Sequence, residues 1–227
     1  MAVVESAYRK IAGDCLARHV ALVAVSKTKP AADILALYNM GHRDFGENYV
    51  QELVEKQASL PEDIRWHFIG HLQSNKVKYI APFVHMIHGI DSMKLLQEVN
   101  KQGARKSRKI NCLLQVHVAV EETKFGMDET ELHSLLEDYT AADEMEFARV
   151  CGLMAMASFT DHRETIIKEF RTVRQLFESC KDRYFYHDEY FREMSMGMSG
   201  DYQLAMEEGS TMVRIGSLIF GERTAAL

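Results

Sequence analysis

The segment ALVAVSKTKP, residues 21–30, contains five apolar residues, then a serine, and then Lys27. A short apolar run of this kind is typical of a strand that is buried on both faces of a parallel sheet. Pro30 and Gly41 then delimit a helix, because proline is favoured in the first turn of a helix and glycine after the last. The segment therefore predicts a buried strand over residues 21–26 that ends at Lys27 and is followed by a helix.

The same alternation of a short apolar segment with a helical period recurs along the chain, after a predicted N-terminal helix at residues 2–18. Further strands are expected at residues 44–47, 65–69, 84–90, 111–120, 149–155, 192–196 and 212–220. Strands separated by helices form parallel sheets, and eight such units close economically into an α/β barrel, although an open sheet also fits the pattern. No linker is evident, so we expect residues 1–227 to form one domain.

Composition narrows the class of protein. Hydrophobic residues make up 47% of the chain, which is enough for a substantial core, and the net charge of −6 argues against a general nucleic-acid binder. The four cysteines form no CxxC pair, which favours reduced thiols and a cytoplasmic location. No apolar run approaches the roughly 20 residues that cross a membrane, and we expect no membrane association.

Two segments rich in small residues follow the last predicted strands, SMGMSGD at 195–201 and VRIGSLIFG at 213–221. In eight-stranded barrels the loops after strands seven and eight often bind phosphate. Ser199, Gly216 and Ser217 are therefore candidate phosphate-binding residues, because amides at a helix start attract anions and small side chains let them approach. Each segment alone is explained equally well by a serine cap or by a bulge in a strand.

Lys27 is expected to face these turns across the mouth of the barrel. Its amine can condense with an aldehyde once desolvation lowers its pKa, so a phosphate-bearing aldehyde such as pyridoxal phosphate suits both features. The alternative is a lysine whose stem packs on apolar surface while its charge stays in water, as we expect for Lys29. Lys124 is a further candidate amine, although a solvated loop lysine is the simpler interpretation.

Arg214 precedes Gly216 by two residues and so shares its face of the predicted strand. A buried arginine needs an acceptor, and here it could donate to a pyridine nitrogen, which would then stay unprotonated and make the ring a weak electron sink. The alternative is a structural salt bridge with an acid. His67 and His71 suggest a metal pair, but no acid completes the ligand set, and we expect no metal.

The segment FGENYVQE, residues 45–52, brings two acids and two amides to a predicted strand-to-helix junction. Glu47, Asn48, Gln51 and Glu52 are either polar groups at the mouth of a pocket or caps and a solvated helix face.

Six ordered segments show that the chain resembles the YggS/PROSC family of pyridoxal phosphate homeostasis proteins. They are VAVSKTKP (23–30), FGENYVQE (45–52), WHFIGHLQSNK (66–76), GLMAM (152–156), SMGMSGDY (195–202) and AMEEGSTMVRIGSLIFG (205–221). The resemblance implies a single barrel like the N-terminal domain of alanine racemase, with pyridoxal 5'-phosphate held as a Schiff base on Lys27. It implies that the remaining pocket residues are Ser199, Gly216 and Ser217 at the phosphate, Arg214 at the ring nitrogen, and Asn48, His67 and Met154 in the lining.

The resemblance also implies a role in cofactor homeostasis, in which the protein buffers pyridoxal phosphate or supplies it to apo-enzymes. The alternatives are an amino-acid racemase or lyase, and a phosphate-binding barrel that forms no Schiff base. The similar racemases take an acid/base tyrosine from a domain after the barrel, whereas only six residues follow Gly221 here. Because a racemase needs a proton donor on each face of the substrate carbon, we expect a monomeric binding protein without turnover.

Overall fold

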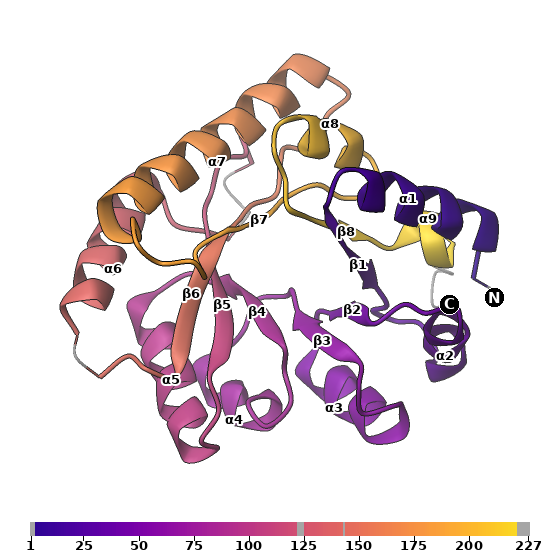
Figure 1. Ribbon diagram of the computed structural model, residues 1–227, viewed down its shortest axis with the longest axis horizontal. Coiled ribbons are helices and arrows are strands. Elements are labelled where there is room, and N and C mark those ends of the chain that lie inside the picture. The colour runs from indigo at the N-terminus through magenta and orange to yellow at the C-terminus, as the bar shows by residue number, and fades with distance from the viewer. Residues whose placement is uncertain (1–2, 122–124, 143, 222–227) are drawn as a thin grey trace.

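Eight parallel strands close into a barrel in the computed structural model, which describes residues 3–121, 125–142 and 144–221. Strands that are adjacent in sequence are adjacent in the barrel, and the last strand pairs in parallel with the first (Figure 1). The strands are β1 (Ala21–Val25), β2 (Asp44–Glu47), β3 (Arg65–Phe68), β4 (Met86–Ile90), β5 (Ile110–Gln115), β6 (Ala148–Met154), β7 (Glu193–Ser195) and β8 (Met212–Ile215). The predicted α/β barrel is confirmed.

Helices surround the barrel and connect its strands (Figure 1). They are α1 (Glu5–Ala17), α2 (Ala31–Asn39), α3 (Val50–Ser59), the 3₁₀ turn η1 (Ser74–Lys76), α4 (Val77–Ile80), α5 (Met93–Arg105), α6 (Glu129–Ala141), α7 (Arg163–Tyr184), α8 (Tyr202–Glu207) and α9 (Ser217–Phe220). Local sequence explains where some of them begin. At α6, for example, Asp128 and Glu131 form a reciprocal capping box. Within the described ranges, no helix combines the length and apolarity that a membrane crossing requires.

The end of the chain differs from the predicted last strand. β8 ends at Ile215, and the apolar residues after it form α9 instead of continuing the sheet. Ile219 and Phe220 are fully buried on this short helix, and the Val4 amide before α1 donates to the Ile219 carbonyl at 2.8 Å. The α9 helix therefore packs beside α1 (Figure 1). The predicted strand was wrong here because a short apolar run is compatible with a buried helix as well as with a buried strand.

The fifth strand is also shorter than the predicted 111–120. Regular pairing stops at Gln115, and the chain then pairs with its own returning segment through the Val116–Met127 bridge. The His117 amide donates to the Met127 carbonyl, and the Met127 amide donates to the Gln115 carbonyl, both at 2.9 Å. These bonds turn the chain out of the barrel before the predicted end. Lys124 lies outside the described residues.

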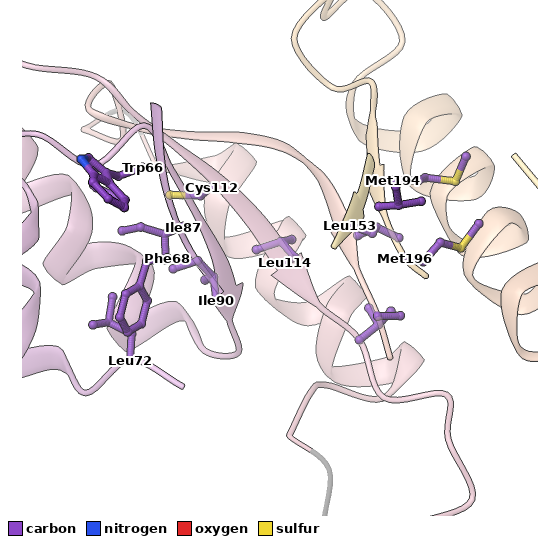
Figure 2. Packing of buried hydrophobic residues seen from close by; sticks show 14 of the residues in the cluster. Trp66, Phe68, Leu72, Ile87, Ile90, Cys112, Leu114, Leu153, Met194 and Met196 are labelled. Carbon is purple, nitrogen blue, oxygen red and sulfur yellow. The ribbon is translucent and has the colours of Figure 1, made fainter. Parts of the chain in front are cut away.

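The strands are buried on both faces, which explains why they read as continuous apolar runs. Inside the barrel, one cluster consists of Val23, Met86, Leu113, Cys151, Met154 and Met212. On the outer face of the same strands, side chains pack against the helices; Figure 2 shows part of this outer core, including Trp66, Phe68, Ile87 and Leu114. In β5 the alternation is direct, because Leu113 points inward while Cys112 and Leu114 belong to the outer core.

Candidate functional site

A cavity of about 580 Å³ lies where the carboxyl ends of the strands meet. Its size suits a small-molecule ligand. Its lining comes from the segments after β1, β2, β3, β6, β7 and β8, so residues distant in sequence converge on it. Six of the eight predicted site residues are in this lining, namely Lys27, Asn48, Ser199, Arg214, Gly216 and Ser217.

The other two predicted residues, His67 and Met154, are not among the described lining residues. They are 2% and 1% exposed and lie deeper in the barrel. In each case the residue two positions further along the strand direction, Ile69 or Met156, lines the cavity instead. Both were expected in the lining on the family resemblance, and the structure buries them beneath the described lining residues.

The turn that carries Lys27 is held on both sides. Thr28 has a φ of 64°, a left-handed conformation that is costly for a β-branched residue. Its amide donates to Glu52 Oε1 at 2.6 Å. Lys29, expected in water, instead donates from Nζ to the Phe220 and Gly221 carbonyls at 2.9 and 3.1 Å. The turn is thereby tied both to α3 and to the end of α9.

A buried ionic cluster supports the same turn from below. Lys56 Nζ lies 2.7 Å from Glu47 Oε1 and 2.6 Å from Glu52 Oε1, and it donates to the Ser26 carbonyl at 2.8 Å. Glu47 is fully buried, so neither a cap nor a solvated face describes it. Its burial raises its pKa, while Lys56 and the Ser26 hydroxyl oppose that shift. The Glu52–Lys56 spacing of four residues was the one signal for this cluster in the sequence.

The loops predicted to bind phosphate converge on one side of the cavity. Gly197 adopts a φ of 96°, and a Cβ there would meet the Ala205 side chain at 2.5 Å, so the turn from β7 toward Ser199 requires glycine. Gly216 precedes α9 instead of lying within a strand, and Ser217 begins that helix. The first amides of a helix have no partner within it, so both loops can present donors to an anion.

Arg214 is 4% exposed and crosses the interior beneath the cavity. Nη1 donates to the Ser195 carbonyl and hydroxyl oxygens, both at 2.7 Å, and Nη2 donates to the Ala155 carbonyl at 2.9 Å. Burial lowers the pKa of Arg214 to about 10, so the guanidinium is still protonated at neutral pH. The predicted alternative was a salt bridge with an acid. The described hydrogen bonds of Arg214 go instead to neutral carbonyl and hydroxyl oxygens.

Asn48 contributes an acceptor that the protein itself leaves unused. Its Oδ1 is buried and has no hydrogen-bond partner among the described residues, and the side chain lines the cavity. A buried acceptor without a partner costs about 1–3 kcal/mol. A ligand with a hydroxyl or protonated nitrogen at this point would remove that cost.

His67 and His71, considered together in the sequence as a metal pair, have different surroundings. His67 is in the interior, whereas His71 is stacked on Phe125 at 4.4 Å between ring centroids and lies 3.3 Å from Asp91. In the described part of the chain, no three His, Cys, Asp or Glu side chains are grouped closely enough to hold a metal ion.

Taken together, the cavity offers a lysine amine, two loops suited to an anion, a guanidinium donor and an amide acceptor. These groups fit pyridoxal phosphate, which has an aldehyde, a phosphate, a ring nitrogen acceptor and a ring hydroxyl. The unpaired Asn48 oxygen is the observation that favours a ligand over an empty cleft.

Comparison with known proteins agrees with this chemistry. Residues 4–224 match the family model described as alanine racemase, N-terminal domain. A protein of Aquifex aeolicus named pyridoxal phosphate homeostasis protein is 40% identical over 203 residues, covering 89% of this chain and 86% of that protein. A human protein of the same name is 42% identical over 214 residues, covering 89% of this chain and 76% of that protein.

Solved structures give the same result. PipY of Synechococcus elongatus without PLP superposes with a TM-score of 0.83 at 34% identity, covering 89% of this chain and 93% of that one. PipY with PLP bound superposes with a TM-score of 0.80 at 33% identity and the same coverage. Alanine racemase from Bartonella henselae, at 19% identity and a TM-score of 0.67, shares the fold over 93% of this chain and 56% of its own. The chain therefore belongs to the alanine racemase N-terminal domain family and, within it, to the pyridoxal phosphate homeostasis proteins.

Proposed function

We propose that this protein binds pyridoxal 5'-phosphate through a Schiff base on Lys27 and serves in cofactor homeostasis by buffering it or supplying it to apo-enzymes. The observation that carries the proposal is the convergence of Lys27, the two small-residue loops and Arg214 on one cavity. The names of the related proteins and the PLP bound to PipY support it.

Each residue has a distinct part in binding. Lys27 supplies the amine, and Ser199, Gly216 and Ser217 hold the phosphate. Arg214 donates toward the ring nitrogen, and Asn48 accepts from a donor on the ligand. His67 and Met154, which we expected in the lining, act from the layer beneath it.

A binding role fits the cavity better than catalysis does. When bound, the cofactor supplies an electrophilic aldehyde and an electron-withdrawing ring. A protonated Arg214 can only donate, so it leaves the ring nitrogen unprotonated and the ring a weak electron sink. The titratable side chains among the described lining residues are Lys27, Lys29, Asp201 and Arg214, and Lys29 is engaged by two carbonyls. The lining thus presents no tyrosine or histidine as a second acid/base group within the described ranges.

The absorption spectrum tests the site. Wild-type protein incubated with pyridoxal phosphate is expected to show a visible band that borohydride bleaches into an adduct on Lys27. The Lys27→Ala variant should lose both band and adduct, while Lys10→Ala, which changes an exposed lysine of α1 outside the cavity lining, should keep them. An unchanged band in Lys27→Ala would reject the Schiff base and favour a simple phosphate-binding barrel.

A transfer experiment then separates carrier from enzyme. Loaded protein should activate an apo-enzyme faster than spontaneous release of the cofactor allows, and it should not exchange the α-proton of any amino acid in deuterated water. Proton exchange with any amino acid would instead support the racemase or lyase alternative. Transfer no faster than release would argue against direct supply and leave buffering.

We also propose that the protein works in the cytoplasm as a single-domain monomer. All four cysteines are buried free thiols, which suits a reducing compartment. Sedimentation at micromolar concentration should give the mass of one chain, and fractionation of cells should place it with the cytoplasmic proteins.

A further inference from the structure

A chain of polar side chains runs through the inside of the barrel, from the cavity to the opposite end. Arg214 Nη1 is 2.7 Å from Ser195 Oγ, and Ser195 Oγ is 3.0 Å from His88 Nδ1. His88 Nε2 is 2.9 Å from His67 Nδ1, and His67 Nε2 is 3.1 Å from Asp44 Oδ1. Ser195 and His88 are fully buried, so bulk water does not replace these bonds.

The two ends of this chain determine its direction. Arg214 can only donate, and the carboxylate of Asp44 can only accept. Burial disfavours a charge on Asp44, but hydrogen bonds from Arg65 and His67 outweigh it and lower the pKa of Asp44, so the carboxylate is ionised. His67 must therefore carry its proton on Nε2.

The intermediate groups then follow in order. In the arrangement that we infer, His67 Nδ1 accepts from His88 Nε2, and His88 Nδ1 accepts from the Ser195 hydroxyl. An extra proton on His88 would place a second cation in a dry interior, separated from Arg214 only by the Ser195 hydroxyl. Burial of its ring is the main reason that the pKa of His88 is lowered, and this favours a neutral ring.

Other charged groups around the chain do not alter this direction. His85 lies beside His67, with 5.3 Å between ring centroids, and burial lowers the pKa of His85 to about 4. Arg65 is paired with Asp44 at the far end of the barrel. Neither group offers an alternative acceptor to His67 Nε2 in the described contacts.

The consequence for Arg214 is specific. The only proton of the Ser195 hydroxyl is committed to His88, so Ser195 Oγ faces the guanidinium as an acceptor. Three of the five guanidinium N–H groups are used by Ser195 and Ala155, and Arg214 lines the cavity with two N–H groups that these contacts do not use. Aligned hydrogen bonds polarise one another, so the charge of Asp44 also helps to stabilise the buried cation.

We propose that Ser195, His88, His67 and Asp44 form a one-directional hydrogen-bond relay that positions Arg214 for the ring nitrogen of the cofactor. This inference rests on the proposed function and adds four positioning residues to it, none of which touches the ligand. It also gives the buried His67 a role other than lining the pocket.

Nitrogen-15 NMR of histidine-labelled apo-protein at neutral pH tests the relay without any cofactor. The expected result is that His67 and His88 are both neutral and carry their protons on Nε2, with Nδ1 unprotonated. A proton on Nδ1 of either ring would overturn the direction that we infer. Signals are assigned from the variants His67→Asn and His88→Gln.

A second experiment measures the effect on the ligand. His88→Leu is expected to weaken pyridoxal phosphate binding by about tenfold to hundredfold and to shift the visible band, because Ser195 and His67 lose their partner. His88→Gln keeps a donor and an acceptor and should stay within a few-fold of wild type. Gln102→Leu, a buried polar change at α5 outside the cavity lining, should bind as wild type does.

The outcomes separate the two proposals. Wild-type affinity and spectrum in a folded His88→Leu variant, with a borohydride adduct on Lys27, would overturn the relay and leave the proposed function intact. Absence of any adduct in wild type would overturn the proposed function and the cofactor role of the relay, while the NMR experiment would still decide its direction. If His88→Leu does not fold, His88→Gln, which should match wild type, and the NMR result decide.

Discussion

Lys27 and Arg214 line the same cavity, but the structure holds the segments that carry them by different means. The Lys27 turn rests on an ionic cluster in which Lys56 lies between Glu47 and Glu52. Arg214 is held by carbonyl oxygens and a serine hydroxyl, and the nearest carboxylate in its relay lies at the far end of the barrel.

The difference matches what each segment must do. The turn that carries Lys27 has strained backbone at Thr28, so it needs strong anchors. Arg214 must keep N–H groups available for a ligand, and a direct salt bridge would occupy them. The neutral acceptors hold the guanidinium through three of its five N–H groups, so two are not used by these contacts. The following changes, in order of decreasing expected effect, would break or sharpen this comparison.

Removing Lys56, the cation of the ionic cluster, should have the largest effect on the free energy of unfolding. Lys56→Met leaves Glu47 buried without its partner and is expected to reduce the free energy of unfolding by about 3–5 kcal/mol, as measured by urea denaturation. Pyridoxal phosphate affinity should also fall, because the Lys27 turn loses its support. The double variant Glu47→Gln/Lys56→Met should recover much of the stability. Equal losses in the single and double variants would show that packing, not charge, holds the turn.

Removing one neutral acceptor of Arg214 should lower the free energy of unfolding by less than the Lys56→Met change does. Ser195→Ala deletes the hydroxyl that accepts from the guanidinium and is expected to lower stability by about 1–3 kcal/mol. Ligand affinity should fall with it, since Arg214 loses an anchor. Ser210, another buried serine of similar size, bonds only to strand carbonyls, so Ser210→Ala serves as a control that lowers stability without the specific loss of affinity. The same affinity loss in both variants would contradict the comparison.

The far end of the relay should respond to acid. Because hydrogen bonds from Arg65 and His67 hold the pKa of Asp44 below its unfolded value of 3.8, its contribution to stability is complete above that pH and is lost as the pH falls further. Asp44→Asn should reduce the slope of unfolding free energy against pH below about 4 by up to ~1.4 kcal/mol per pH unit. Thermal unfolding measured from pH 2.5 to 7 tests this, and parallel curves for wild type and variant would refute it.

Relieving the strain at Thr28 should have the smallest effect on stability. Glycine accepts the left-handed φ of 64°, but it also loses more backbone freedom on folding. Thr28→Gly is therefore expected to change stability by less than about 1 kcal/mol. Its amide still donates to Glu52, so the position of Lys27 should be kept, and the rate of adduct formation should be close to that of wild type. A large loss of stability would mean that the threonine side chain has a further role.

The sequence predicted the architecture well because each unit of an α/β barrel repeats a local pattern. Apolar runs such as residues 21–25 and 110–115 lie where the prediction placed buried strands. The errors occurred where a local pattern is ambiguous: residues 217–220 are apolar enough for a strand but form α9 against α1.

Local sequence signals indicated part of the candidate site and could not indicate how deep in the barrel each residue lies. Lys27, Gly216 and Ser217 lie at the ends of strands, where barrel geometry brings loops together, so local signals sufficed. The level within the barrel depends on the register of neighbouring strands, and no local signal reports it. His67 and Met154, which the resemblance implied in the lining, lie beneath the described lining residues.

By itself, the sequence determined the order of strands and helices and the lysine and small-residue loops at the strand ends, because these depend on short-range periodicity and turn chemistry. Only the tertiary structure decided which polar groups meet inside the barrel. Asp44, His67, His88, Ser195 and Arg214 come from five different strands, and nothing in the local sequence of any one of them indicates the other four. Their hydrogen bonds form only when the closed barrel brings those strands around one dry interior.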